Sequence, residues 1–159
     1  MHIIDLKHQI KDMLIEFTKA VTTKQYFGVN INANDSLGYF SNLYPNVKNI
    51  TGWVYVIFNA DGQQCKIGHT CQDPVLRAKK IFSITEATPL YIAAFPVVGA
   101  KPWHVERFVQ NMLYAGGLQA IDRKLGKVTA KSGGTEIFNI RPSVACALIE
   151  QTIESVCFT

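Results

Sequence analysis

Residues 53–77 constrain the fold most, because they predict a β-hairpin that leads directly into a helix. Residues 53–58 (W-V-Y-V-I-F) form an unbroken β-branched and aromatic run, which is typical of a strand buried on both faces. Asp61-Gly62 is a strong turn signal, and residues 65–68 supply a short return strand. Asp73-Pro74 combines an N-cap residue with a first-turn proline, so a helix is expected to begin there.

The alternation of side chains along this hairpin points to a possible site. Tyr55 and Ile57 share one face of the first strand, and a turn at the Asp-Gly pair sets Tyr55 opposite Gly68. The same turn sets Ile57 opposite Lys66, so Tyr55 and Lys66 become diagonal neighbours, with Arg77 entering from the helix. Such a group can bind a phosphate and remove a proton. A register shift of one residue would instead leave an ordinary tyrosine and a surface lysine.

Length and composition favour a single globular domain with a sizeable core. The chain has 159 residues, of which 48% are hydrophobic and 18% charged, so it is not of the disordered class. No apolar run reaches the length of a membrane span and no secretory signal is visible, so a cytoplasmic protein without a membrane partner is expected. The net charge of +4 permits nucleic-acid binding. The cysteines lack disulfide and zinc spacings and are expected to be reduced thiols: Cys65, Cys71, Cys146 and Cys157.

The chain divides into an N-terminal extension, residues 1–50, and a main domain, residues 51–159. Residues 1–24 carry apolar side chains at three- and four-residue spacing, which predicts an amphipathic helix. That helix either packs on its own domain or forms the seam of a homodimer. Residues 25–52 are rich in Asn, Gly and Ser and are expected to be irregular, with aromatic side chains that either anchor to the core or stack on bases.

The order of the remaining elements predicts an α+β domain with a small sheet covered by helices. The elements expected are a helix over 73–83, a strand over 90–98, a helix over 102–114, a basic loop over 116–134, a strand over 135–140 and a last helix from 142. Val105, Phe108, Val109 and Met112 are expected to form the buried stripe of the helix over 102–114.

Glu106 falls at the edge of that apolar stripe, where its carboxylate is half shielded. A carboxylate in such a position can hold a metal ion at the wall of a cleft. The alternative is a structural glutamate at the rim of the helix, paired with a lysine or arginine.

Cations gather in two further places. They are Lys79 and Lys80 on the helix after the hairpin, and Arg123, Lys124, Lys127 and Lys131 in the basic loop. These side chains either form solvated faces or, beside a phosphate site, contact a nucleic-acid backbone.

Several motifs occur in an order and spacing that resemble the GIY-YIG nuclease superfamily, most closely its phage and bacterial branch. They are V-Y-V-I at 54–57, K-I-G-H-T at 66–70, Arg77, V-E-R at 105–107 and T-E-I-F-N at 135–139, with T-P-L at 88–90 as a minor mark. The resemblance covers about residues 52–140 and leaves residues 1–50 unassigned.

The resemblance implies a small three-stranded antiparallel sheet flanked by helices, and metal-dependent cleavage of a DNA phosphodiester. It implies that Tyr55 is a general base or positions the attacking water, and that Arg77 neutralises the scissile phosphate. Glu106 would be the single protein ligand of Mg²⁺ or Mn²⁺. Lys66 stands where many members have a second tyrosine, and Gly68 matches the glycine of that motif.

Two further positions carry over from the same resemblance. His69 follows the second motif, where some members place a catalytic histidine, and Asn139 matches a late asparagine that steadies the phosphate. A tyrosine with its reference pKa near 10 is a poor base. Lys66 is therefore expected either to lower the pKa of Tyr55 or, when neutral, to take the proton itself.

Three alternatives remain at this stage. The chain is a nuclease, or it is a domain of the same fold that binds DNA without cutting it. If residues 1–50 form a homodimer interface, the arrangement would suit a restriction-type enzyme that cuts both strands.

Overall fold

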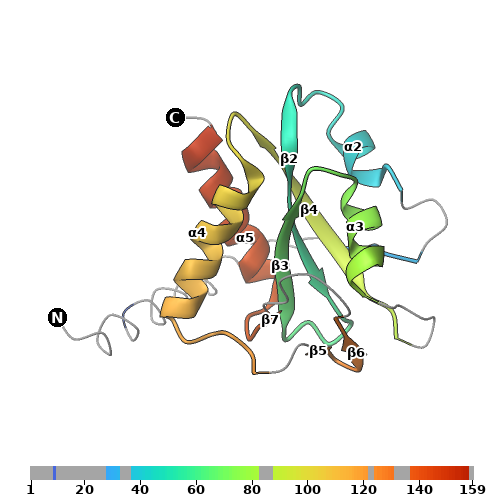
Figure 1. The fold of residues 1–159 in the computed structure, drawn as a ribbon, viewed down its shortest axis with the longest axis vertical. Coiled ribbons are helices and arrows are strands. Elements are labelled where there is room, and N and C mark those ends of the chain that lie inside the picture. The colour runs from blue at the N-terminus through green and yellow to red at the C-terminus, as the bar shows by residue number, and fades with distance from the viewer. Residues whose placement is uncertain are drawn as a thin grey trace.

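The computed structural model describes residue 9 and residues 28–32, 37–82, 88–121, 124–130 and 137–157. The chain forms an α+β fold built on a five-stranded antiparallel sheet in the order β1-β4-β2-β3-β7 (Figure 1). Three strands are long: β2 (Ile50–Phe58), β3 (Cys65–Thr70) and β4 (Tyr91–Val98). Two-residue strands lie at the edges: β1 (Val29–Asn30) and β7 (Ile137–Phe138).

The predicted α+β class is confirmed, but the expected number of three strands is wrong. The long strands β2, β3 and β4 form the centre of the sheet. A strand of only two residues is added at each edge, β1 beside β4 and β7 beside β3. β7 falls within the strand predicted over 135–140 and is confirmed at residues 137 and 138, whereas no strand was predicted at β1, which is too short to carry a periodic signal.

The predicted hairpin register is confirmed. Tyr55 pairs with Gly68 and Ile57 pairs with Lys66 across β2 and β3. Alternate residues of β2 enter two separate cores: Val54 and Val56 in one, and Tyr55 and Ile57 in the other. The sheet is therefore buried on both faces, as the apolar run had predicted.

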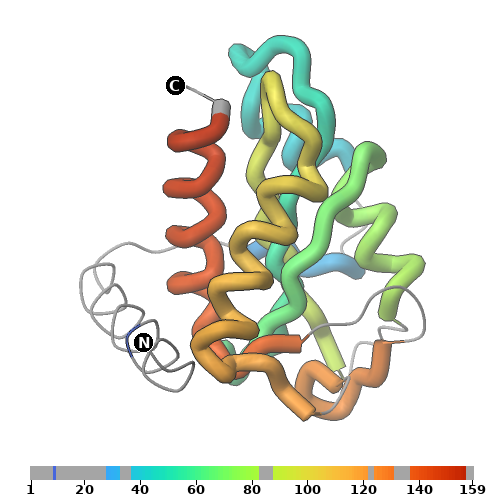
Figure 2. The backbone as a smooth tube through the Cα atoms, turned by 60° about the vertical axis from the view of Figure 1, so that its left-hand side comes forward, coloured from blue at the N-terminus to red at the C-terminus, as the bar shows by residue number. Residues whose placement is uncertain are grey.

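Helices cover both faces of the sheet. One face packs against α4 (Pro102–Ala115) and α5 (Pro142–Cys157), and the other against α3 (Pro74–Ile81) and the short α2 (Tyr39–Leu43), as Figure 2 shows from a second direction. In the part of the chain that is described, none of the helices combines the length and the apolar character that crossing a membrane requires.

The buried stripe of α4 is narrower than expected. Val105, Val109 and Leu113 are buried, whereas Phe108 is 56% exposed, so its predicted place in the core is wrong. At 3.6 residues per turn, Phe108 lies about 100° from the centre of the stripe. Its spacing of three residues from Val105 therefore does not bring its side chain into the core.

The basic segment expected as a loop over 116–134 contains a small hairpin. Its strands are β5 (Lys124–Leu125) and β6 (Val128–Thr129), and the chain reverses at Gly126, whose φ of 62° suits glycine. Leu125 and Val128 are buried in the core on the α3 side of the sheet. These two apolar contacts hold the basic hairpin against the domain.

The predicted N-terminal helix over residues 1–24, with the homodimer seam proposed for it, lies outside the described residues except for Gln9, which is helical. Arg123 and Lys131 also lie outside them, as do Thr135 and Glu136 of the last motif.

Candidate active site

A cavity of about 260 Å³ opens at the edge of the sheet between β3, α3 and α4. Among the described residues, β7 pairs with β3 only at Cys65 and Lys66, so no described strand covers the outer edge of the second half of β3. The cavity lies beside that uncovered edge. Its walls therefore come from both faces of the sheet.

Five predicted site residues line this cavity together with Gly68: Tyr55, Lys66, His69, Arg77 and Glu106. They come from four elements, namely β2, β3, α3 and α4. Because β3 alternates, Lys66 and Gly68 lie on the α3 side of the sheet with Tyr55, whereas His69 lies on the α4 side. The cavity thus gathers side chains that strand alternation alone would separate.

Asn139 is not among the cavity residues, so the structure does not bring this predicted site residue to the others. It is exposed, and its Oδ1 accepts a hydrogen bond of 2.6 Å from Nε2 of Gln64. Asn139 directly follows β7, which pairs with the first residues of β3. It therefore lies toward the start of β3, whereas the cavity lies beside Gly68 and His69.

Tyr55 is buried and lies across the backbone of β3. A Cβ added at Gly68 would lie 2.5 Å from Cζ of Tyr55, and closer still to the hydroxyl oxygen. Only a residue without a side chain leaves room for the phenol here. The glycine of the K-I-G motif therefore has a direct steric role in placing Tyr55 on the cavity wall.

Burial raises the pKa of Tyr55 to about 12, against the charge and hydrogen bonding of Arg77, which lower it. Glu106 adds a smaller contribution that raises the pKa further. The expectation that a nearby cation would bring this pKa below 10 is therefore wrong, because desolvation of the phenolate outweighs the cation. At neutral pH Tyr55 carries its proton.

Arg77 is positioned by a well-defined start of α3. The carboxylate of Asp73 accepts hydrogen bonds from the backbone N–H groups of Val75 (2.9 Å) and Leu76 (3.2 Å), as an N-cap does. Its second oxygen accepts one of 2.7 Å from the backbone of Gly38, which ties α3 to the segment before α2. Arg77 lies one turn inside this anchored helix and lines the cavity.

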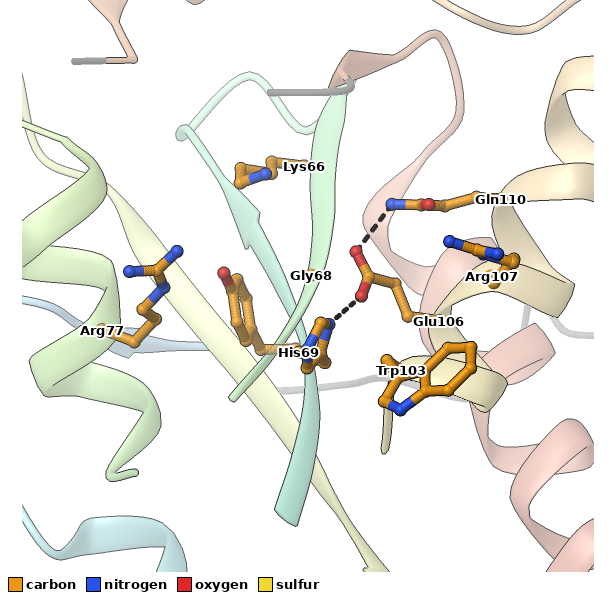
Figure 3. Close-up of a pocket in the computed structure, with 9 residues that line it drawn as sticks. Lys66, Gly68, His69, Arg77, Trp103, Glu106, Arg107 and Gln110 are labelled. Atoms are coloured by element: carbon orange, nitrogen blue, oxygen red, sulfur yellow. Dashed lines mark hydrogen bonds and ion pairs between the residues drawn. The ribbon is translucent and has the colours of Figure 1, made fainter. Parts of the chain in front are cut away.

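Glu106 has a side chain only 15% exposed, and both of its oxygens contact protein groups (Figure 3). Oε1 accepts a hydrogen bond of 2.9 Å from Nε2 of Gln110, and Oε2 contacts Nδ1 of His69. The same Gln110 nitrogen donates to the carbonyl of Ile67 at 3.1 Å. The alternative prediction gave Glu106 a lysine or arginine as its partner. The partners in the structure are instead a histidine and a glutamine.

Gln110 was not singled out from the sequence, although a signal for it existed. It lies four residues after Glu106, so the two side chains share one face of α4. Two other cavity residues were missed as well: Trp103 and Arg107, whose guanidinium carbon lies 5.4 Å from the centre of the indole ring.

The cavity suits a hard divalent cation better than zinc. Glu106 is the single carboxylate among the described residues that line it, and no group of three or more His, Cys, Asp or Glu side chains gathers in the described parts of the chain. A structural zinc site needs about four protein ligands, whereas Mg²⁺ tolerates one or two carboxylates with water and phosphate oxygens. A metal ion held by Glu106 would therefore be of the Mg²⁺ or Mn²⁺ kind, with water and phosphate oxygens as its other ligands.

The described cations predicted to grip DNA lie outside the cavity. Lys79 is half-buried on α3, and Lys80 is exposed beside it and donates a hydrogen bond of 3.3 Å to Oε1 of Gln72. Lys124 and Lys127 are exposed on the β5–β6 hairpin. A bridge between Phe82, just after α3, and Ala130, just after β6, brings the hairpin close to the end of that helix.

The cavity thus combines a buried phenol, a buried lysine, two arginines and a glutamate held by a histidine and a glutamine. Comparison of the chain with models of known protein families gave no match, and neither did comparisons with curated proteins or with solved structures. Any assignment of function therefore rests on the chemistry of these side chains.

Proposed function

We propose that this protein is a metal-dependent endonuclease that hydrolyses DNA phosphodiester bonds, with a site of the GIY-YIG type. The observation that carries the proposal is the convergence of Tyr55, Arg77 and Glu106 from three separate elements on one cavity. Hydrolysis of a phosphodiester needs an oriented water, neutralisation of charge on the phosphate and help for the leaving oxygen. The cavity holds a suitable group for each need.

Arg77 is the group that binds the reacting phosphate. A guanidinium keeps its charge at every physiological pH and offers donors in a fork that matches two phosphate oxygens. The N-cap at Asp73 fixes the helix that carries it, so its position does not have to be reorganised during the reaction. The same charge faces Tyr55 and opposes the effect of burial on its pKa.

Tyr55 orients the attacking water rather than deprotonating it, because its raised pKa keeps the hydroxyl protonated. Lys66 is 2% exposed and lines the cavity on the same side as Tyr55. Its amine, in the neutral form, is the group assigned to accept the proton of the attacking water. This division of roles selects the second of the two options that the sequence left open for Lys66.

Glu106 is the residue that would hold Mg²⁺ or Mn²⁺, which when bound supplies Lewis acidity at the phosphate and stabilises the leaving oxygen. His69 and Gln110 keep the carboxylate in one orientation, as outer partners of metal ligands commonly do. The exposed lysines of α3 and of the β5–β6 hairpin supply contacts to the DNA backbone away from the cavity.

One observation favours the second candidate, a domain that binds DNA without cutting it. Both oxygens of Glu106 already have partners within the protein, so the carboxylate is satisfied without a metal ion. In that case Arg77 and the surface lysines would hold phosphates, and Glu106 would brace α4 against β3.

A supercoiled-plasmid assay with the wild type and Glu106→Gln, in Mg²⁺, Mn²⁺ or EDTA, separates the two candidates. A nuclease nicks or linearises the plasmid only with metal, and Glu106→Gln loses cutting while binding persists. Unchanged cutting by the variant would remove Glu106 from the mechanism. If the plasmid and a duplex with a central run of unpaired nucleotides both stay intact in all conditions, while a gel shift survives EDTA, the binding domain would be established instead.

A further inference from the structure

Trp103 is a large aromatic side chain left partly in solvent at the wall of the cavity. Its exposed fraction is 38%, whereas the only other tryptophan of the chain, Trp53, is 5% exposed within the core. Trp103 lies in the first turn of α4, one turn before Glu106. The indole therefore stands beside the proposed metal ligand, as Figure 3 shows.

Two neighbours on the helix hold the indole in place. The guanidinium carbon of Arg107 lies 5.4 Å from the ring centre, a cation–π arrangement at i, i+4 spacing. The imidazole of His104 packs beside it, with 3.8 Å between the ring centres. A ring fixed in this way loses little conformational entropy when a ligand stacks on it.

Arg107 also faces the cavity, from the wall opposite Arg77. The two guanidinium groups come from α4 and α3, and Glu106 lies between them (Figure 3). Successive phosphates along a strand carry one charge each. If Arg77 binds the reacting phosphate, the guanidinium of Arg107 can bind the neighbouring phosphate of the same strand.

We infer that Trp103 and Arg107 form a subsite for the nucleotide next to the reacting phosphate, with its base stacked on the indole and its phosphate on the guanidinium. A base within a paired duplex already has neighbours on both faces, so stacking on Trp103 requires an unpaired nucleotide. The inference rests on the proposed function, and it specifies the substrate class: DNA with an unpaired nucleotide at the cleavage position.

The test measures binding in EDTA, where no cutting occurs, to a fully paired duplex and to a duplex of equal length with a central run of unpaired thymines. The wild type is expected to prefer the unpaired DNA by about tenfold, the effect of stacking about one base on an aromatic side chain. Stacking also quenches tryptophan fluorescence, and Trp53 is too buried to contribute to that change.

The variants make the assignment specific to this subsite. Trp103→Ala is expected to lose the preference, and Trp103→Phe to keep most of it, because a phenyl ring still stacks. Arg107→Ala should weaken binding to both DNAs and lower the slope of affinity against salt by about one. Phe108→Ala is the matched control, since this aromatic residue is more exposed, lies on the same helix and does not line the cavity.

Equal affinity of the wild type for the two DNAs, or an unchanged preference in Trp103→Ala, would overturn the subsite. If metal-dependent cutting of plasmid persisted in that case, the proposed nuclease would stand without it. A preference that depends on Trp103 in a protein that cuts no DNA would support the subsite and reject the nuclease.

Discussion

Nδ1 of His69 contacts Oε2 of Glu106, and this contact joins β3 to α4 across the cavity. The two residues are 37 positions apart in the chain, and each lies on the wall of the same cavity. The contact orients the one carboxylate in the described lining, and Gln110 fixes its other oxygen. The proposed metal ligand is therefore held before any ion binds.

Replacing Gln110 with leucine should impair the proposed reaction without unfolding the protein. The substitution removes the donor to Oε1 of Glu106 and to the carbonyl of Ile67 while keeping similar bulk on the helix. Loss of an outer partner of a metal ligand typically costs about 10- to 100-fold in metal affinity or activity. A Mg²⁺ titration of the cleavage rate should show the loss.

The matched control for that experiment is Asn111→Ala, at an exposed position next to Gln110 on the same helix. It should leave both the cleavage rate and the Mg²⁺ dependence unchanged. A Gln110→Leu variant that behaves like this control would show that the carboxylate needs no support from Gln110.

Arg77→Ala should lower the single-turnover cleavage rate by about two to three orders of magnitude, as expected for removal of a preorganised charge at the transition state. Arg77→Lys should recover little of the loss, because an ammonium cannot match the two-pronged geometry. Leu76→Ala, at an exposed neighbouring position on α3, is the control. Full activity of Arg77→Lys would mean that only charge, and not the fork, is used.

The raised pKa of Tyr55 predicts a specific loss of stability in alkaline solution. The phenol has a pKa of about 12 in the folded protein and 10.0 in the unfolded chain, so unfolding releases a proton between these values. The contribution of Tyr55 to stability is present below pH 10 and is lost as the pH rises toward 12. Chemical denaturation of the wild type and Tyr55→Phe across this range should show a smaller decline in the variant.

Tyr39→Phe serves as the control for this pH experiment, because the Tyr39 side chain is exposed. Its stability should decline with pH as that of the wild type does. A Tyr55→Phe variant with the same decline as the wild type would show that the phenol is not desolvated in the folded protein.

Gly68→Ala should destabilise the fold by about 1–3 kcal/mol, the usual cost of forcing extra volume into a packed site. The new methyl group would overlap the ring and hydroxyl of Tyr55 and push the phenol from the cavity wall. Thermal unfolding measures the effect on stability. Gly62→Asn is the comparison, since nothing lies within 4 Å of a Cβ there and asparagine tolerates its positive φ. An unchanged melting temperature for Gly68→Ala would contradict the close packing of Tyr55 on β3.

The hairpin is the part of the molecule that the sequence predicted in most detail. The Asp-Gly turn and the alternating pattern set the register of β2 against β3, and they placed Tyr55 opposite Gly68 as the structure has it. The start of α3 at Pro74 was predicted for the same reason: a capping residue and a first-turn proline act on the chain within one turn. Local signals of this kind do not depend on the rest of the fold.

Other features depended on contacts between distant segments. Periodicity placed Glu106 at the edge of a helix, but it carried no information on which strand that edge would meet. The sequence predicts that Lys66 lowers the pKa of Tyr55 or takes the proton itself, whereas burial of Tyr55 in the closed core has the largest effect on that pKa and raises it. Asn139 shared a motif with the site but followed a strand that pairs elsewhere on β3.

The sequence by itself determined the α+β class, the central hairpin and the side of the strand on which Tyr55 and Lys66 lie, because turns, caps and alternation act over a few residues. The tertiary structure alone decided that His69 meets Glu106, that Gln110 and Trp103 line the cavity, and that Asn139 does not. Those outcomes follow from how α4 packs against the uncovered edge of β3. Such packing is the sum of many weak contacts between segments far apart in the chain.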